Sequence, residues 1–227
     1  MKNRIVGARS MAALKSLACV ACLAAAQALQ AAPVTYNFTT APGPYGASPG
    51  GLMSLFNATD VVSGSFVYDA DSPITGTGSA NATIYGYAAP PVVPSYSSLA
   101  GTIGTYAFSD PRGFVTVGND QPLGGPGPMT LRDSVQFYSD TFTATGPHNF
   151  VGFNIGGYTL VNVRFLWIES EDVADFLSSQ DLPATPPTFM GRLVLDFVPT
   201  DNPTLPATSF VYFNGVKVTP AIPGTCN

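Results

Sequence analysis

Short runs of alternating apolar and polar side chains recur along this chain, with turn-forming residues between them. The clearest run is Val34–Phe38, where valine, tyrosine and phenylalanine alternate with threonine and asparagine. This period of two is typical of a strand with one buried face. Similar runs occupy residues 61–68, 82–87, 102–108, 113–117, 134–138, 150–155, 158–168, 191–198 and 208–218. Their number and spacing predict an all-β fold, an antiparallel β-sandwich of the jelly-roll or immunoglobulin-like (Ig-like) type.

Local signals predict two hairpins and one short helix within this sandwich. Asn214-Gly215 and Gly156-Gly157 each separate two short strand-like runs, and both pairs suit a two-residue hairpin turn. In Glu171–Leu177 the apolar residues follow helical spacing and acidic residues occupy the first turn, which predicts a short helix. We expect Phe176 and Leu177 to dock this helix on the sheet.

The first 31 residues differ from the rest of the chain. They begin with Lys and Arg, continue with the apolar run Ser16–Ala26, and end with small residues at Ala28 and Ala31. This order predicts a secretory signal peptide over residues 1–31, cleaved after Ala28 or after Ala31. The apolar run is shorter than the roughly 20 residues needed to cross a bilayer. We therefore expect a secreted or extracellular protein, with the periplasm as the alternative.

The remaining chain is predicted to form one acidic domain over residues 33–220, followed by a flexible tail over 221–227. Its Pro- and Gly-rich stretches are typical of loops rather than of an interdomain linker. Only five Lys and Arg residues remain there against 14 Asp and Glu, so the formal net charge is −9. Such a charge repels phosphate backbones and anionic lipid, which argues against nucleic acid as a partner. No membrane anchor is expected, and Cys226 alone allows no internal disulfide.

Two acidic groups are candidates for a calcium site, the one cofactor that the sequence suggests. Asp69 and Asp71 follow a predicted strand, and Glu169, Glu171 and Asp172 lie at a predicted strand-to-helix junction. Calcium binds carboxylate and carbonyl oxygens in loops of this kind. The alternative is purely structural. Asp69 and Asp71 would then cap a turn, and the second group would supply negative charge to a helix N-terminus.

Three tyrosines are candidates for ligand binding. Tyr85, Tyr87 and Tyr96 flank a Pro-rich loop, where their rings would offer a stacking face to sugars. Core packing is the alternative for these aromatic side chains, and it is the expected role of Trp167. No catalytic residue is predicted. Gly46–Gly50 matches the G-x-S-x-G pattern, with His148 as the one available base, but Pro49 has no N–H to complete an oxyanion hole.

Several short blocks resemble a known family of secreted proteins. They are the run Val62–Asp69 with its Gly-x-Phe-x-Tyr-Asp pattern, then Asp133–Phe137, Gly157–Leu160 and Leu177–Pro183. In this order they resemble the secreted β domains of Gram-negative proteins that carry a C-terminal PEP-CTERM sorting signal. The resemblance implies display on the cell surface or in an exopolysaccharide matrix, and it carries no catalytic residues over to this chain. The Pro-Glu-Pro motif, apolar helix and basic cluster of that signal are not seen before Asn227.

These observations lead to two functional hypotheses. The first is a non-enzymatic protein of the cell surface or extracellular matrix that binds exopolysaccharide or other surface proteins. The alternative is a secreted hydrolase that acts on a glycan or another polymer through carboxylates, since two acids brought together in space need no sequence signature.

Overall fold

The computed structural model describes residues 32–79, 81–85, 98–123, 130–139, 150–169, 175–201 and 209–222. Pro33–Asn227 forms one compact unit, separate from Met1–Ala32. Its strands are β1 (Val34–Thr39), β2 (Gly46–Ser48), β3 (Val62–Tyr68), β4 (Ile74–Ser79), β5 (Ala82–Tyr85), β6 (Leu99–Ile103), β7 (Tyr106–Asp110), β8 (Gly113–Leu123), β9 (Thr130–Ser139), β10 (Asn154–Ile155), β11 (Tyr158–Ile168), β12 (Gly191–Pro199) and β13 (Ser209–Pro220). One 3-10 helix, η1 (Gly50–Leu55), follows β2. The all-β prediction is confirmed.

The strands form one continuous antiparallel sheet in the order β4-β5-β8-β9-β11-β12-β13-β1-β3-β6-β7, while β10 pairs with β11 and β2 with β13. Both edge strands, β4 and β7, depart from a regular, free edge. The pairing of β4 with β5 contains two register shifts. At the other edge, Val151 forms an isolated bridge with Ser109 of β7.

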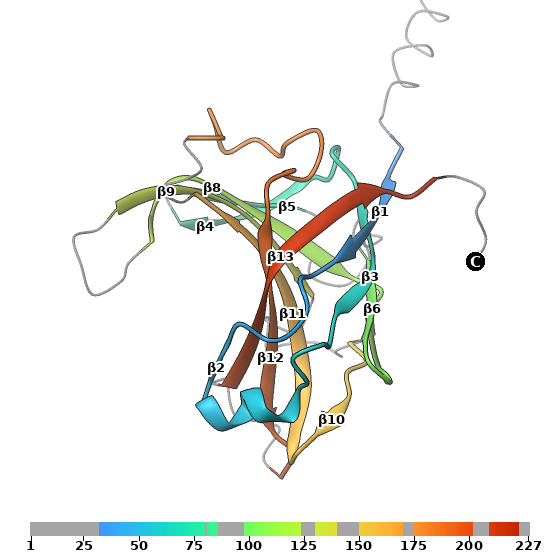
Figure 1. The fold of residues 1–227 in the computed structure, drawn as a ribbon. Helices are drawn as coiled ribbons and strands as arrows, with labels where there is room; N and C mark the ends of the chain where they lie inside the picture. The colour runs from blue at the N-terminus through green and yellow to red at the C-terminus, as the bar shows by residue number, and fades with distance from the viewer. Residues whose placement is uncertain are drawn as a thin grey trace, which may run out of the picture. The chain divides into compact units, whose positions relative to one another are not determined.

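Strand β13 connects the two halves of this sheet (Figure 1). Its first part pairs with β12 and its last part with β1. Between them the register shifts, because Gly191 pairs with Val216 whereas Arg192 pairs with Asn214. Gly215 is the extra residue, with φ +68°, so it forms a β-bulge that bends the strand. The predicted hairpin at Asn214-Gly215 is therefore wrong: the strand continues through it.

The bend lets the two halves of the sheet face each other across an aromatic core. Phe66 of β3 lies 5.1 Å from Phe137 of β9 and 5.4 Å from Phe165 of β11, between ring centroids. Phe38 of β1 meets Phe165 edge-on at 4.7 Å. Trp167 stacks on Phe165 and is buried, as predicted. The core thus holds the sheet as a sandwich in which β1, β3, β6 and β7 cover the half built around β12.

The structure tests three further predictions about strands and their turns. The hairpin at Gly156-Gly157 is confirmed, since both residues have positive φ and join β10 to β11. The single strand predicted over 102–108 is wrong, because Gly104 at φ +55° turns the chain between β6 and β7. Of the strand predicted over 150–155, only Asn154–Ile155 and the bridge at Val151 form.

The helix predicted over Glu171–Leu177 lies partly outside the described residues. Asp175, Phe176 and Leu177 are described and are not helical. Phe176 and Leu177 do pack against the core, as expected from their apolar side chains. Elsewhere in the described part of the chain, η1 is helical. Among the described residues, no helix is long and apolar enough to cross a membrane.

Candidate functional site

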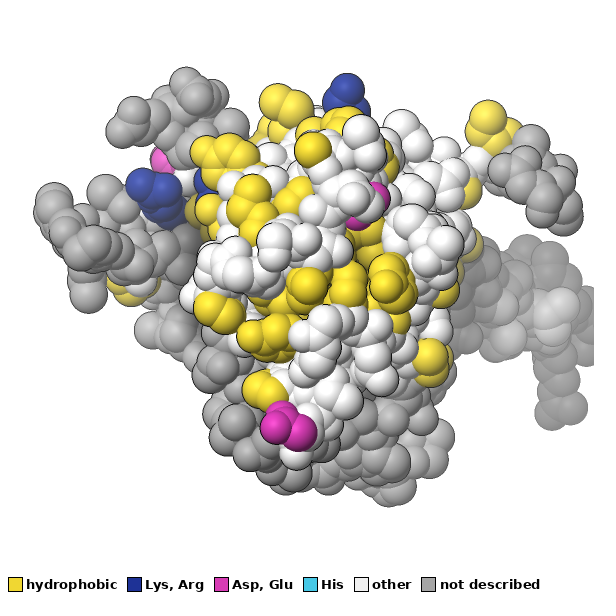
Figure 2. Space-filling model, turned by 60° about the horizontal axis from the view of Figure 1, so that its bottom comes forward, with side chains coloured by type: hydrophobic (Ala, Val, Ile, Leu, Met, Phe, Trp, Pro, Cys, Tyr) yellow, Lys and Arg dark blue, Asp and Glu magenta, His cyan; other side chains and the backbone are white. Residues whose placement is uncertain are grey.

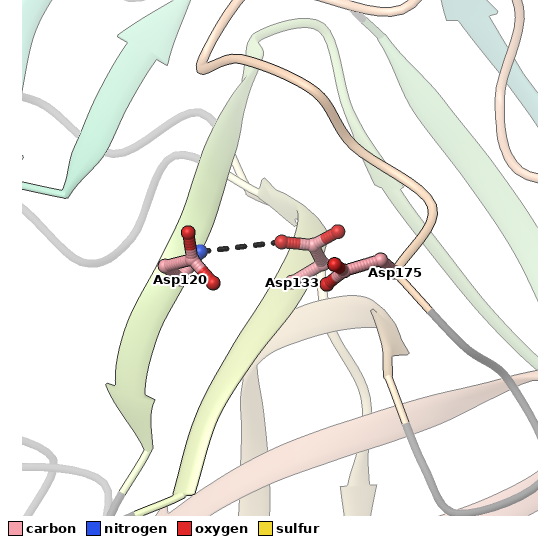
Figure 3. A group of neighbouring side chains, drawn as sticks. All are labelled: Asp120, Asp133 and Asp175. Carbon is pink, nitrogen blue, oxygen red and sulfur yellow. Dashed lines mark hydrogen bonds between the residues drawn. The ribbon is translucent and has the colours of Figure 1, made fainter.

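Three aspartates from separate segments meet at one edge of the core. Carboxylate oxygens of Asp120, Asp133 and Asp175 all lie within 4.8 Å of one another (Figure 3). Asp120 lies in a bulge of β8, where its φ of +53° is tolerated by aspartate. Asp133 belongs to β9, and Asp175 lies between β11 and β12. We call these three residues the acidic cluster.

Asp133 is the fully buried member of the acidic cluster, with 0% of its surface exposed. Its Oδ2 accepts the backbone N–H groups of Phe176 at 2.9 Å and Leu177 at 2.7 Å. Its Oδ1 accepts the N–H of Asp120 at 3.2 Å. The carboxylate therefore anchors the backbone of Phe176 and Leu177 to the β8–β9 bulge, because these partly buried N–H groups need an acceptor.

The carboxylates of the acidic cluster also repel one another. The nearby Asp133 carboxylate raises the pKa of the exposed Asp175 carboxyl above its usual value, with smaller contributions from Glu169, from burial and from Asp120. Glu169, one of the residues predicted to bind calcium, lies beside the cluster, since its Oε2 accepts the N–H of Asp133 at 3.0 Å. Two other predicted ligands, Glu171 and Asp172, lie outside the described residues. The calcium site stays a prediction.

The other acidic pair forms a turn. Asp69 is buried, and its Oδ1 accepts the backbone N–H of Asp71 at 3.0 Å. The Asp69 carbonyl accepts the N–H of Ser72. This is the side-chain-capped turn that the sequence allowed as the alternative to calcium binding, and it gives Asp69 a structural role.

Tyr85 is placed in the core rather than on a ligand-binding surface. Only 5% of the residue is exposed. Its hydroxyl donates to the carbonyl of Gln180 at 2.8 Å, which ties the loop before β12 to β5. This burial favours the core-packing alternative for Tyr85, and the stacking role stays a prediction. Tyr87 and Tyr96 lie outside the described residues.

The G-x-S-x-G segment has more regular structure than its sequence predicts. Gly46–Ser48 forms β2, and η1 begins at Gly50. Ser48 is exposed, but Pro49 still provides no N–H beside it. His148 lies outside the described residues.

A different surface brings aromatic and cationic side chains together. On the half of the sheet built around β12, directly paired residues share a face, and the side that points away from the core carries one row across five strands. This row consists of Phe114, Tyr138, Arg164, Val194 and Tyr212. Arg192 and Asp196 flank Val194 on the same side of β12. We call this surface, with Tyr45 next to it, the aromatic–arginine face.

Its rings are held by close contacts. Tyr138 stacks on Phe114 with centroids 4.9 Å apart and planes at 7°. Tyr45, which is 64% exposed, lies 5.5 Å from the Tyr212 ring. The Arg192 guanidinium carbon lies 5.9 Å from the centroid of that same ring. A Cβ at position 46 would come within 2.5 Å of the Tyr212 ring, so Gly46 is what lets this ring lie against β2.

A bidentate ion pair crosses the same face. Arg164 donates from Nε and Nη2 to the two carboxylate oxygens of Asp196, at 2.7 Å each. Asn162 Nδ2 also donates to Asp196 Oδ2, at 2.9 Å. Burial raises the pKa of the Tyr138 hydroxyl, which donates to Gln136 Oε1. Asp196 therefore fixes the Arg164 side chain on this face, next to Tyr138 on the neighbouring strand.

Two further surfaces differ in chemistry from this face. An open hollow of about 450 Å³ on β3, β6 and β7 is lined by small residues such as Ser63, Ala100 and Thr102, with no charged side chain. Figure 2 views the end of the unit that carries η1, β2 and β10, and hydrophobic side chains gather across its middle with few charges. Met53 is 38% exposed and Tyr106 37% exposed; both contribute to the apolar surface of the unit.

Comparison with known proteins identifies no relative. No protein-family model matches the chain, and neither a curated protein nor a solved structure is significantly similar to it.

Proposed function

We propose that this chain is an exported, non-enzymatic protein of the cell surface or extracellular matrix, and that its aromatic–arginine face binds polysaccharide. One observation carries the proposal: Tyr45 and Tyr212 lie beside Arg192 on a broad sheet face. The signal peptide expected in residues 1–31 supports a location outside the cytoplasm.

The chemistry of this face suits sugars. The apolar side of a sugar ring packs on an aromatic ring, and a tyrosine offers both a flat apolar surface and a hydroxyl. Guanidinium and amide groups supply hydrogen-bond donors in fixed directions for sugar hydroxyls. Phe114 and Val194 of the row are buried, so the open part of the face is formed by Tyr45, Tyr212 and Arg192. These side chains lie on the sheet surface and not in an enclosed pocket, which matches an extended polymer better than a small molecule.

The acidic cluster gives little support to the alternative hydrolase. A glycosidase needs one carboxyl that protonates the leaving group and another that attacks the sugar or activates water. Asp133 is fully buried, and both of its oxygens accept backbone N–H groups. It is thereby occupied as a structural anchor, which favours the binding function over hydrolysis.

The test uses protein purified after expression of the full chain. Binding to a panel of soluble polysaccharides is measured by affinity electrophoresis and calorimetry, with Tyr45→Ala as the variant. Tyr45 is mostly exposed, so its removal should leave the fold intact, which the melting temperature checks. We expect an affinity loss of about 10-fold, the effect of removing one stacking ring.

Tyr106→Ala is the matched control, because Tyr106 is an exposed tyrosine on β7 and not on this face. It should bind as the unaltered protein does. The proposal fails if no polysaccharide binds, or if both variants lose affinity equally.

A further inference from the structure

The cationic side chains of this acidic protein are unevenly placed. Beyond residue 31 the chain has five Lys and Arg residues and 14 acidic ones. Two of the five, Arg164 and Arg192, lie on the aromatic–arginine face.

Acidic side chains are rare on this face. Among the described outward-pointing residues of β8, β9, β11, β12 and β13, Asp196 is the one carboxylate, and Arg164 neutralises it. Asp120 and Asp133 belong to the acidic cluster at the edge of the core. Arg164, Arg192 and Asp196 therefore give the face a formal charge of +1 within a domain whose formal charge is −9.

Arg192 is the cation best placed to meet a ligand. It is exposed, its guanidinium lies over the Tyr212 ring, and it forms no ion pair with a described acidic residue. A guanidinium in a cation–π contact still has its planar fork of N–H groups, which matches the two oxygens of a carboxylate. By contrast, the Nε and Nη2 groups of Arg164 already donate to the two carboxylate oxygens of Asp196.

We propose that the polysaccharide bound by this face is anionic and carries carboxylates, as uronic-acid polymers do. This inference rests on the polysaccharide-binding function proposed above. The tyrosines pack on the sugar rings, while Arg192 pairs with a carboxylate of the polymer. Nucleic acid also combines flat rings with negative charge, and the experiment below includes it as an alternative ligand.

The test compares two polymers with the same backbone: polygalacturonate and polygalacturonate whose carboxyl groups have been reduced to alcohols. We expect the full-chain protein to bind the first at least about 10-fold more tightly, the usual gain from a charge-assisted bidentate pair. Affinity for polygalacturonate should fall as salt rises, because exposed charges are screened.

Arg192→Gln is the informative variant, since it removes the charge and keeps a hydrogen-bonding side chain. We expect it to bind both polymers equally weakly, with little remaining salt dependence. Lys217→Gln is the matched control, because Lys217 is exposed and pairs with Thr39 on the other half of the sheet. It removes the same charge from the domain and should leave the preference unchanged. Arg192→Lys keeps the charge and loses the planar fork, so it should restore affinity only in part.

The outcomes separate this inference from the proposed function. Equal binding of both polymers by the unaltered protein, with loss in Tyr45→Ala, would overturn the anionic ligand and leave polysaccharide binding intact. Binding of neither polymer, nor of any in the wider panel, would overturn both. Tighter binding of single-stranded DNA than of polygalacturonate would overturn the inference in favour of a nucleic-acid ligand.

Discussion

Replacing Asp133 with alanine tests the anchoring role of the acidic cluster. The substitution removes the acceptor of two short hydrogen bonds, from the N–H groups of Phe176 and Leu177, and of a longer one from Asp120. These donors lose their partner at a site where Asp133 itself is 0% exposed. Phe176 and Leu177 would then lose their attachment to β9, although their side chains would still pack on the core.

The expected loss follows from these contacts. A hydrogen bond to a charged group stabilises by about 1.5–3 kcal/mol, so the two short bonds together contribute about 3–6 kcal/mol. Relief of the repulsion with Asp175 offsets part of this loss. We expect a net decrease in the free energy of unfolding of about 2–4 kcal/mol. In a domain of this size that lowers Tm by about 5–15 °C.

Urea denaturation and calorimetry measure the decrease, and hydrogen exchange should show faster exchange at the Phe176 and Leu177 amides. Asp175→Asn is the control, since it removes a neighbouring charge that accepts none of these bonds. If the free energy of unfolding of Asp133→Ala lies within about 1 kcal/mol of that of the unaltered protein, the anchoring role is refuted. One such hydrogen bond alone should contribute more than this. Anchoring by hydrogen bonds needs no cation, so chelator should leave Tm unchanged. A lower Tm in chelator, seen in the unaltered protein and not in Asp133→Ala, would instead support the calcium prediction.

Three further predictions concern pH and the backbone. Repulsion raises the pKa of Asp175 in the folded state, so the contribution of this group to stability is greatest below about pH 4 and falls as the pH rises. Asp175→Asn should make the free energy of unfolding less dependent on pH, as urea titrations between about pH 3.5 and 7 can measure. Burial raises the pKa of Tyr68, whose hydroxyl donates to the Pro183 carbonyl at 2.5 Å. The stability of the folded protein should therefore decline above about pH 10, and that of Tyr68→Phe should decline less steeply, as circular dichroism can measure. Gly215→Ala forces a side chain into φ +68° with its Cβ 3.1 Å from another Cβ, and should destabilise by about 1–2 kcal/mol in urea. Gly51→Ala, with open space around the new Cβ, should stay within about 0.5 kcal/mol, and equal losses in both variants would contradict the role of the bulge.

Local patterns predict those elements whose partners are close in sequence. The alternation over 158–168 gives the bounds of β11, and Gly156-Gly157 gives its hairpin, because the residues that pair across that turn are adjacent. Gly215 is a position where the local sequence does not determine the structure. Its preference for positive φ is visible in the sequence, but a hairpin turn and a bulge both use it. The choice depends on β12 and β1 pairing with the two parts of β13, which is a long-range contact.

The candidate sites are predictable to different degrees for the same reason. Glu169 was identified from its own segment and does lie at the acidic cluster. Asp120, Asp133 and Asp175 come from three segments, and no spacing in the sequence relates them. The aromatic–arginine face depends on the order β2-β13-β12, which sets Tyr45 and Arg192 against the same ring although they are far apart in the chain.

The modified edges of the sheet bear on how this protein behaves when many copies are crowded together. A free edge strand is a template on which a second chain can add its own strand, and from there fibres grow. Here the register shifts of β4 interrupt that template at one edge, and Val151 occupies part of it on β7 at the other. Neighbouring copies are thereby discouraged from merging their sheets. The interrupted edges thus act against strand addition between copies of this β-sheet domain.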